Sequence, residues 1–131
     1  MWTSFPDNKP GEPLQPVTLE NITGNHVIVR IAPKQYCLSA HLKARSVRVH
    51  LHQRVRQGDL LAQVGDSGNT TAPHLHFQVM DNNSALQAEG VPYVLDQFTF
   101  LGFGRDFEEK HHSTLPRSHE LPVDDAVVSF P

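Results

Sequence analysis

Two histidines separated by one residue, His74 and His76, give the strongest chemical signal in the sequence. Alternate residues of a β-strand point to the same face, so this spacing on a strand places two imidazoles side by side. Paired imidazoles are used in metal sites and as acid–base pairs. The spacing alone is weak, because His50 and His52 repeat it in a chain with nine histidines.

The residues that accompany the second pair make it more specific. Four features follow one another along the chain: the turn Gly24-Asn25 before a β-branched run, the tripeptide Ala40-His41-Leu42, a glycine-spaced run over residues 55–70, and the pentapeptide Pro73-His74-Leu75-His76-Phe77. Together they resemble the C-terminal half of the lysostaphin-type (LytM-like) zinc metallopeptidases. The resemblance covers residues 24–81 and continues more loosely to about residue 101.

The resemblance implies a role for three of the histidines. His76 matches the family's zinc ligand, while His74 and His41 match two catalytic histidines that do not hold the metal. A zinc ion with three protein ligands keeps a fourth position for water and lowers the pKa of that water to about 7. Imidazoles beside that water can take its proton or stabilise the developing oxyanion. The resemblance therefore implies a zinc metalloendopeptidase that hydrolyses peptide bonds, chiefly in peptidoglycan cross-links.

The other two metal ligands of the family, a histidine and an aspartate in a His-x-x-x-Asp motif, are not found in the sequence. No histidine is followed by aspartate four positions later, and the 25 residues before His26 contain no histidine. We therefore expect a truncated metallopeptidase domain, and little activity from this chain on its own. A site made of His41, His74 and His76 together remains an alternative, in which both catalytic histidines become ligands.

Two other functions compete with the enzyme. Degenerate members of the resembled family bind and activate cell-wall hydrolases without catalysing, although a degenerate site has no chemical reason to retain three such histidines. A biotinyl- or lipoyl-carrier domain would fit the glycine-spaced run, but it needs a lysine at a hairpin tip. The lysines lie elsewhere, at positions 9, 34, 43 and 110. The other histidines, at positions 26, 50, 52, 111, 112 and 119, are expected at the surface.

Short strands must position these residues, because apolar or alternating segments recur between glycine and proline breaks. The segments are residues 27–31, 36–42, 47–51, 74–80 and 93–101. This pattern is typical of an all-β, mainly antiparallel fold. With the resemblance, it predicts part of the duplicated-hybrid-motif β-sandwich or barrel. Leu75 and Phe77 are expected to face the core behind the histidine pair.

Three parts are predicted along the chain. Residues 1–22 are a proline-rich segment, a remnant of the absent first half; residues 23–102 form the partial metallopeptidase core; residues 103–131 are a polar tail whose end could add an edge strand. Loss of the first half would leave strand edges exposed, so pairing with another chain is expected there.

Composition sets further bounds. The net charge of −3 gives no indication of a nucleic-acid partner. The single cysteine, Cys37, has no disulfide partner in the chain and is expected to be a small buried hydrophobic residue. No segment is predicted to span a membrane, and the polar N-terminus lacks the features of a signal peptide. The resembled family is typically periplasmic, secreted or attached to the cell envelope, with peptidoglycan or a cell-wall hydrolase as the expected partner.

Overall fold

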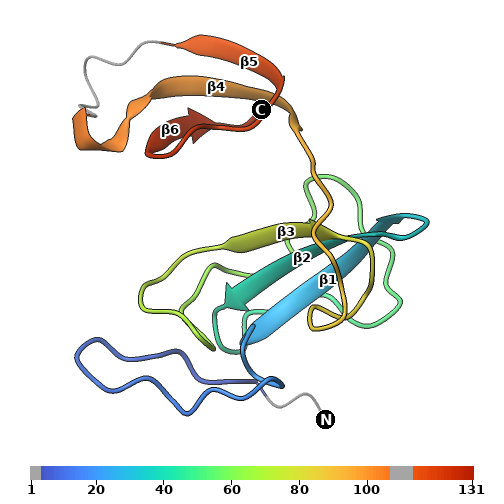
Figure 1. Ribbon diagram of the computed structural model, residues 1–131, viewed down its shortest axis with the longest axis vertical. Coiled ribbons are helices and arrows are strands. Elements are labelled where there is room, and N and C mark those ends of the chain that lie inside the picture. Colours follow the sequence, from blue (N-terminus) through green and yellow to red (C-terminus); the bar gives the residue numbers. More distant parts are fainter. Residues whose placement is uncertain (1–3, 107–113) are drawn as a thin grey trace. The chain divides into compact units, whose positions relative to one another are not determined.

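The first sheet contains three antiparallel strands, β1 (Asn25–Ala32), β2 (Gln35–Leu42) and β3 (His76–Met80), with β2 in the middle (Figure 1). The computed structural model describes residues 4–106 and 114–131. The chain divides into two units, residues 1–91 and 92–131, and this sheet belongs to the first. β1 and β3 form the edges of the sheet, so self-association through them stays a prediction.

The core of the first unit is small and lies on the histidine face of the sheet. Leu38, Ala40 and Met80 form a buried cluster, against which Ile28, Tyr36, Ala85 and Ala88 pack. In the β2–β3 register, Ala40 is paired with His76 and Leu38 with Gln78. Paired residues of antiparallel strands share a face, so His76 lies on the same side as the core.

This register corrects the prediction that Leu75 and Phe77 face the core. Phe77 is paired with Ser39, on the face opposite the core cluster, and its side chain is 41% exposed. Leu75 precedes the strand and is 47% exposed. Of the three alternating apolar residues, only Val79 is buried. The alternation indicates a strand correctly, but it does not say which face is covered.

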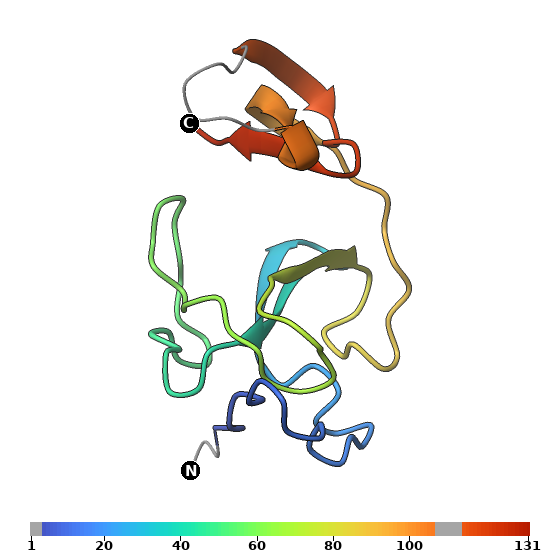
Figure 2. The ribbon, with the colours of Figure 1, turned by 90° about the vertical axis from the view of Figure 1, so that its left-hand side faces the viewer.

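Long loops connect β2 to β3, as the green segment in Figure 2 shows. The strand predicted over residues 47–51 is wrong: the backbone there belongs to no sheet and is joined to the far side of the loop by the bond from the amide of Arg48 to the carbonyl of Leu61, 2.8 Å. Val47 and Val49 are nonetheless more buried than Arg48 and His50. The side chains of residues 47–50 are therefore alternately half-buried and exposed, as in a strand, although the segment is not part of a sheet. This alternation produced the sequence pattern from which the strand was predicted.

The second unit is a separate three-stranded antiparallel sheet. It consists of β4 (Leu95–Phe103), β5 (Leu115–Glu120) and β6 (Ala126–Ser129), in the order β5-β4-β6, with a 3-10 turn, η1 (Gly104–Asp106), after β4. Among the described residues of this unit, Phe98 of β4 is the buried hydrophobic residue. The predicted division placed residues 92–102 with the metallopeptidase core and residues 103–131 in a tail whose end could add an edge strand. Here β4 pairs with β5 and with β6, and β6, near the end of the chain, is an edge strand of this sheet.

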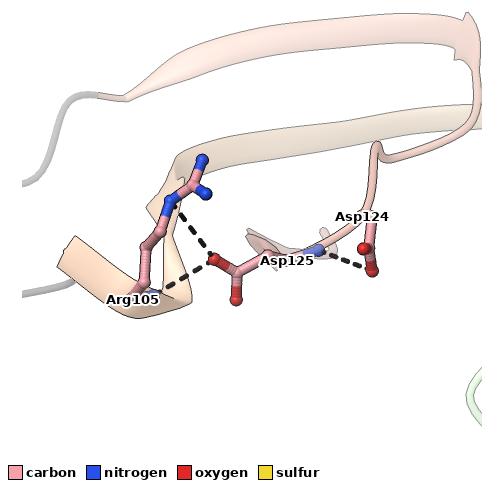
Figure 3. Close-up of polar contacts among 3 residues, drawn as sticks. All are labelled: Arg105, Asp124 and Asp125. Atoms are coloured by element: carbon pink, nitrogen blue, oxygen red, sulfur yellow. Dashed lines mark hydrogen bonds and ion pairs between the residues drawn. The ribbon is translucent and has the colours of Figure 1, made fainter.

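An aspartate closes the end of this second sheet (Figure 3). The Asp125 carboxylate accepts a hydrogen bond from the amide of Arg105 at 3.2 Å and lies 3.9 Å from its guanidinium Nε. The amide of Gly104 donates to the Asp125 carbonyl at 2.8 Å. The side chains of Arg105 and Asp125 are 71% and 43% exposed, so we expect their ion pair to contribute little, and the two bonds from backbone amides to Asp125 define this turn.

The predicted all-β, antiparallel class is confirmed, since the described residues contain two antiparallel sheets and, outside them, one 3-10 turn. Packing of the sheets into a sandwich or barrel stays a prediction. Across residues 4–106 and 114–131, no helix has the length and apolar character needed to cross a membrane. His111 and His112 lie outside the described residues.

Candidate metal and catalytic centre

Three histidines from separate parts of the sequence meet at one end of the first sheet. One nitrogen each of His41, His74 and His76 lies within 4.8 Å of the others. The His41 ring centroid is 4.9 Å from that of His74 and 5.8 Å from that of His76. The structure therefore brings together all three predicted site residues.

The backbone of β2 turns at its end so that His41 can reach this group. Ala40 is paired with His76, so a regular strand would direct the next side chain, His41, to the opposite face. His41 instead has φ 58, in the left-handed region. That conformation costs about 1–2 kcal/mol for a residue other than glycine. Two bonds hold it: the His41 amide donates to the Thr23 carbonyl at 2.9 Å, and Nδ1 contacts the Ser67 carbonyl at 2.8 Å.

In each of the three histidines, a nearby acceptor oxygen determines which ring nitrogen carries the proton and which keeps its lone pair. Because a carbonyl only accepts, Nδ1 of His41 donates to Ser67 and Nδ1 of His74 donates to Ala72, 2.9 Å away. Both rings therefore keep the lone pair on Nε2. His76 is reversed: its Nε2 lies 3.2 Å from Oε1 of Gln78, which leaves the lone pair on Nδ1. Such acceptors behind metal-binding histidines fix tautomer and ring orientation.

Burial distinguishes His41 from its neighbours. His41 is only 7% exposed, whereas His74 and His76 are exposed. Desolvation lowers the pKa of His41, and the neighbouring His74 and His76 imidazoles add to this, against the opposing effects of the Ser67 carbonyl and the Asp66 carboxylate. His41 is therefore neutral at pH 7, the form that can bind a metal or accept a proton.

Close backbone packing places the Ser67 carbonyl. Gly24 and Gly68 both have positive φ and approach each other so closely that a Cβ on Gly68 would overlap the Gly24 backbone. Ser67, fully buried, accepts a bond from the Asn25 amide at 3.0 Å and donates to the Leu42 carbonyl at 2.6 Å through its hydroxyl. The Gly24-Asn25 turn and the glycine-spaced run thus form one packed unit behind His41.

Comparison with known proteins decides the family. The family model described as "Peptidase family M23" matches residues 15–88. The chain belongs to peptidase family M23. This confirms the resemblance to LytM-like peptidases. The matched family is one of peptidases.

Curated relatives of this M23 chain are named as DD-carboxypeptidases or DD-endopeptidases, and one name includes peptidoglycan. It is 33% identical over 103 residues to proteins from Neisseria meningitidis and Neisseria gonorrhoeae named "DD-carboxypeptidase/endopeptidase Mpg", covering 76% of this chain and 23% of the relative. It is 34% identical over 59 residues to "Peptidoglycan DD-endopeptidase ShyC" of Vibrio cholerae, covering 45% of this chain and 13% of that protein. The chain thus spans about a quarter or less of these relatives. No solved structure matches it.

The remaining described histidines of the M23 chain do not belong to the three-histidine group. His50, His52 and His119 are exposed, as predicted. His26 is partly buried, and its Nδ1 lies 2.9 Å from the Thr23 hydroxyl and 3.1 Å from the Gly24 carbonyl.

Sequence reasoning missed the residues that hold the three rings. Ser67, Thr70 and Gln78 were not singled out, although Thr70 Oγ1 lies 3.1 Å from Nδ1 of His74 and the others contact His41 and His76. The sequence did contain a signal for part of this set: small polar residues lie between and just after Gly65 and Gly68, a few positions before the His-x-His pair. Such residues accept or donate locally and shape turns.

Proposed function

We propose that this chain carries the catalytic end of a zinc metalloendopeptidase that hydrolyses peptide bonds in peptidoglycan. The convergence of His41, His74 and His76 in an M23 chain carries the proposal. The relatives include proteins named as DD-endopeptidases, which favours a peptidoglycan cross-link as substrate and the cell envelope as the place of action.

The donor set fits zinc in chemistry but is incomplete in number. Zinc accepts imidazole nitrogen, and one ring nitrogen of each histidine lies within 4.8 Å of the others. In the described part of the chain, no carboxylate joins the three-histidine group. With His76 as ligand, two more protein ligands are needed, and the sequence contains no His-x-x-x-Asp motif to supply them. We therefore expect weak but measurable zinc binding by this chain alone, and tight binding and full activity only when further ligands are supplied.

The two other histidines are proposed to act on protons. Bound zinc would supply an activated water for attack on the peptide carbonyl. His41, neutral and held through its Nδ1–H on the Ser67 carbonyl, accepts a proton at Nε2. The His74 ring, whose centroid lies 4.9 Å from that of His41, is held through Nδ1–H on the Ala72 carbonyl. Its Nε2 can donate a hydrogen bond once it is protonated.

Zinc stoichiometry and peptidoglycan hydrolysis test this proposal together. Zinc per chain is measured in the wild type, in His76→Ala and in His52→Ala, which removes an exposed histidine outside the group. Release of soluble fragments from purified peptidoglycan is followed with and without a chelator. Zinc binding that is lost in His76→Ala and retained in His52→Ala supports the role of His76. Equal zinc content in all three proteins contradicts it.

A non-catalytic role in binding or activating a cell-wall hydrolase is the second candidate. The observation in its favour is the incomplete ligand set among the described residues. In that case the chain binds no stoichiometric zinc and releases no fragments alone, but it raises the rate of a separate hydrolase on the same peptidoglycan. His41→Ala would then leave the stimulation unchanged, because no chemistry passes through the imidazole.

A further inference from the structure

The segment Ser4–Asn8 lies against the loop that carries the acceptors for the catalytic histidines. The amide of Asn8 donates to the carbonyl of Asp66 at 2.8 Å. Its side-chain Nδ2 donates to two further carbonyls, those of Gly68 at 3.0 Å and Thr70 at 3.2 Å. Asp7 forms an isolated antiparallel bridge with Ser67. Asn8 thus contacts the backbone on both sides of the Ser67 carbonyl that receives His41.

The same segment also holds the chain that leaves β2. The carboxylate of Asp7 accepts the Ala44 amide at 3.2 Å, and its Oδ1 lies 3.4 Å from the amide of Asp66. The hydroxyl of Ser4 accepts the amide of Arg45 at 2.9 Å. The loop at residues 43–45 and the loop at residues 66–70 are therefore both tied to one short segment.

A third set of bonds anchors the segment to the first sheet. The Phe5 amide donates to Oδ1 of Asn25 at 2.8 Å, and Nδ2 of Asn25 donates back to the Phe5 carbonyl at 2.8 Å. The same Nδ2 lies 3.1 Å from the Leu42 carbonyl, next to His41. Asn25 is buried, so this two-way bond is protected from water.

We propose that Ser4–Asn8 is a positioning segment for the catalytic centre, acting mainly through the side chain of Asn8. This proposal rests on the proposed function, because the histidines that the segment positions are the ones given catalytic roles in that function. By holding the carbonyls at residues 66–70, Asn8 fixes where the Ser67 carbonyl meets Nδ1 of His41 and where Thr70 meets His74. None of its atoms contacts the reacting groups, so it acts through the loop.

Substitution of Asn8 separates this role from simple packing. Asn8→Ala removes both side-chain donors, and Asn8→Asp puts a carboxylate against two carbonyl oxygens at nearly the same volume. Asn83→Asp, at an exposed position in another loop, makes the same chemical change and serves as the matched control. All variants are produced in the full 131-residue chain, and their folding is checked by circular dichroism.

The main readout is the imidazole ¹⁵N spectrum of the metal-free protein at about pH 8, above the ordinary histidine pKa. In the wild type, His41 and His74 are expected to show a protonated Nδ1 and an unprotonated Nε2. Asn8→Ala should shift both signals toward tautomer mixtures and weaken binding of Co²⁺, used as the probe metal, roughly 10- to 100-fold, the range for groups that orient ligands. Asn83→Asp should change neither quantity.

The outcome that overturns the proposal is a folded Asn8→Ala protein with wild-type ¹⁵N signals for His41 and His74. If Asn8→Asp does not fold, Asn8→Ala decides the question. The spectrum needs neither metal nor substrate, so failure of the proposed function would appear as absent zinc or absent hydrolysis with the Asn8 effect intact. Failure of the positioning role would appear as unchanged histidine signals, whatever the activity.

Discussion

Replacement of Gly68 by alanine tests whether the loop behind His41 is packed as closely as the structure shows. Gly68 has φ +81, and its added Cβ would overlap the backbone nitrogen of Gly24 and lie 2.7 Å from the Gly24 Cα and 2.8 Å from the Asn21 carbonyl. These neighbours are backbone atoms, so the turn itself must move. We expect Gly68→Ala to destabilise the first unit strongly.

Two other glycines separate the contributions to this loss. Gly58 has φ +91 with nothing within 4 Å of an added Cβ, and Gly90 has open space without a positive φ. Gly58→Ala should therefore lose only the left-handed preference, about 1–2 kcal/mol. Gly90→Ala should be neutral or stabilising by up to about 1 kcal/mol. Gly68→Ala adds overpacking of about 1–3 kcal/mol to the left-handed term, for about 2–5 kcal/mol in total.

Urea unfolding followed by circular dichroism measures these free energies, with the change in midpoint compared at constant slope. A loss of about 2–5 kcal/mol is a large part of the roughly 5–15 kcal/mol by which small domains are stable. The reasoning is refuted if Gly68→Ala is no less stable than Gly58→Ala, because the two differ in their surroundings and not in the sign of φ. A folded Gly68→Ala protein should also bind Co²⁺ more weakly, since the Ser67 carbonyl moves with the turn.

Three further outcomes are expected. Gln78→Met should weaken Co²⁺ binding roughly 10- to 100-fold in calorimetry, because it removes the acceptor for Nε2 of His76. Gln97→Met, which replaces an exposed strand glutamine in the other unit, is the control. Equal affinities of the two variants would contradict the role of Gln78 in orienting His76. Leu38→Ala should lower the free energy of unfolding by about 2–5 kcal/mol, and a loss below about 1 kcal/mol would show that the small core is not closely packed. Cys37, whose pKa is raised by burial, should react with iodoacetamide more slowly in the folded protein than in urea, and matching rates would contradict this.

Much of the candidate site could be predicted from local sequence. The pair His74 and His76 and the tripeptide around His41 identified the three imidazoles, and the M23 match confirms the family that they resemble. The all-β class followed from short apolar segments between glycine breaks. These features are local: the residues that accompany each histidine along the chain, together with the spacing, indicate them.

Other features depended on which segments pair, and spacing does not show this. The register of β2 against β3 put the core on the face of His76 and left Phe77 exposed, against the prediction. β4 paired with two later strands, so part of the predicted tail became a sheet. The alternating pattern of residues 74–80 was present, but only the neighbouring strand determines which side is buried.

The sequence by itself determined which side chains could do chemistry, and the tertiary structure decided how they meet. Nothing near His41 in the sequence indicates that its backbone turns left-handed, or that Ser67, 26 positions later, receives its Nδ1 proton. The bonds from Asn8 to Gly68 and Thr70 span 60 and 62 positions. Such contacts are set by the folding of the whole unit, because a strained backbone is kept only where many distant hydrogen bonds hold it together.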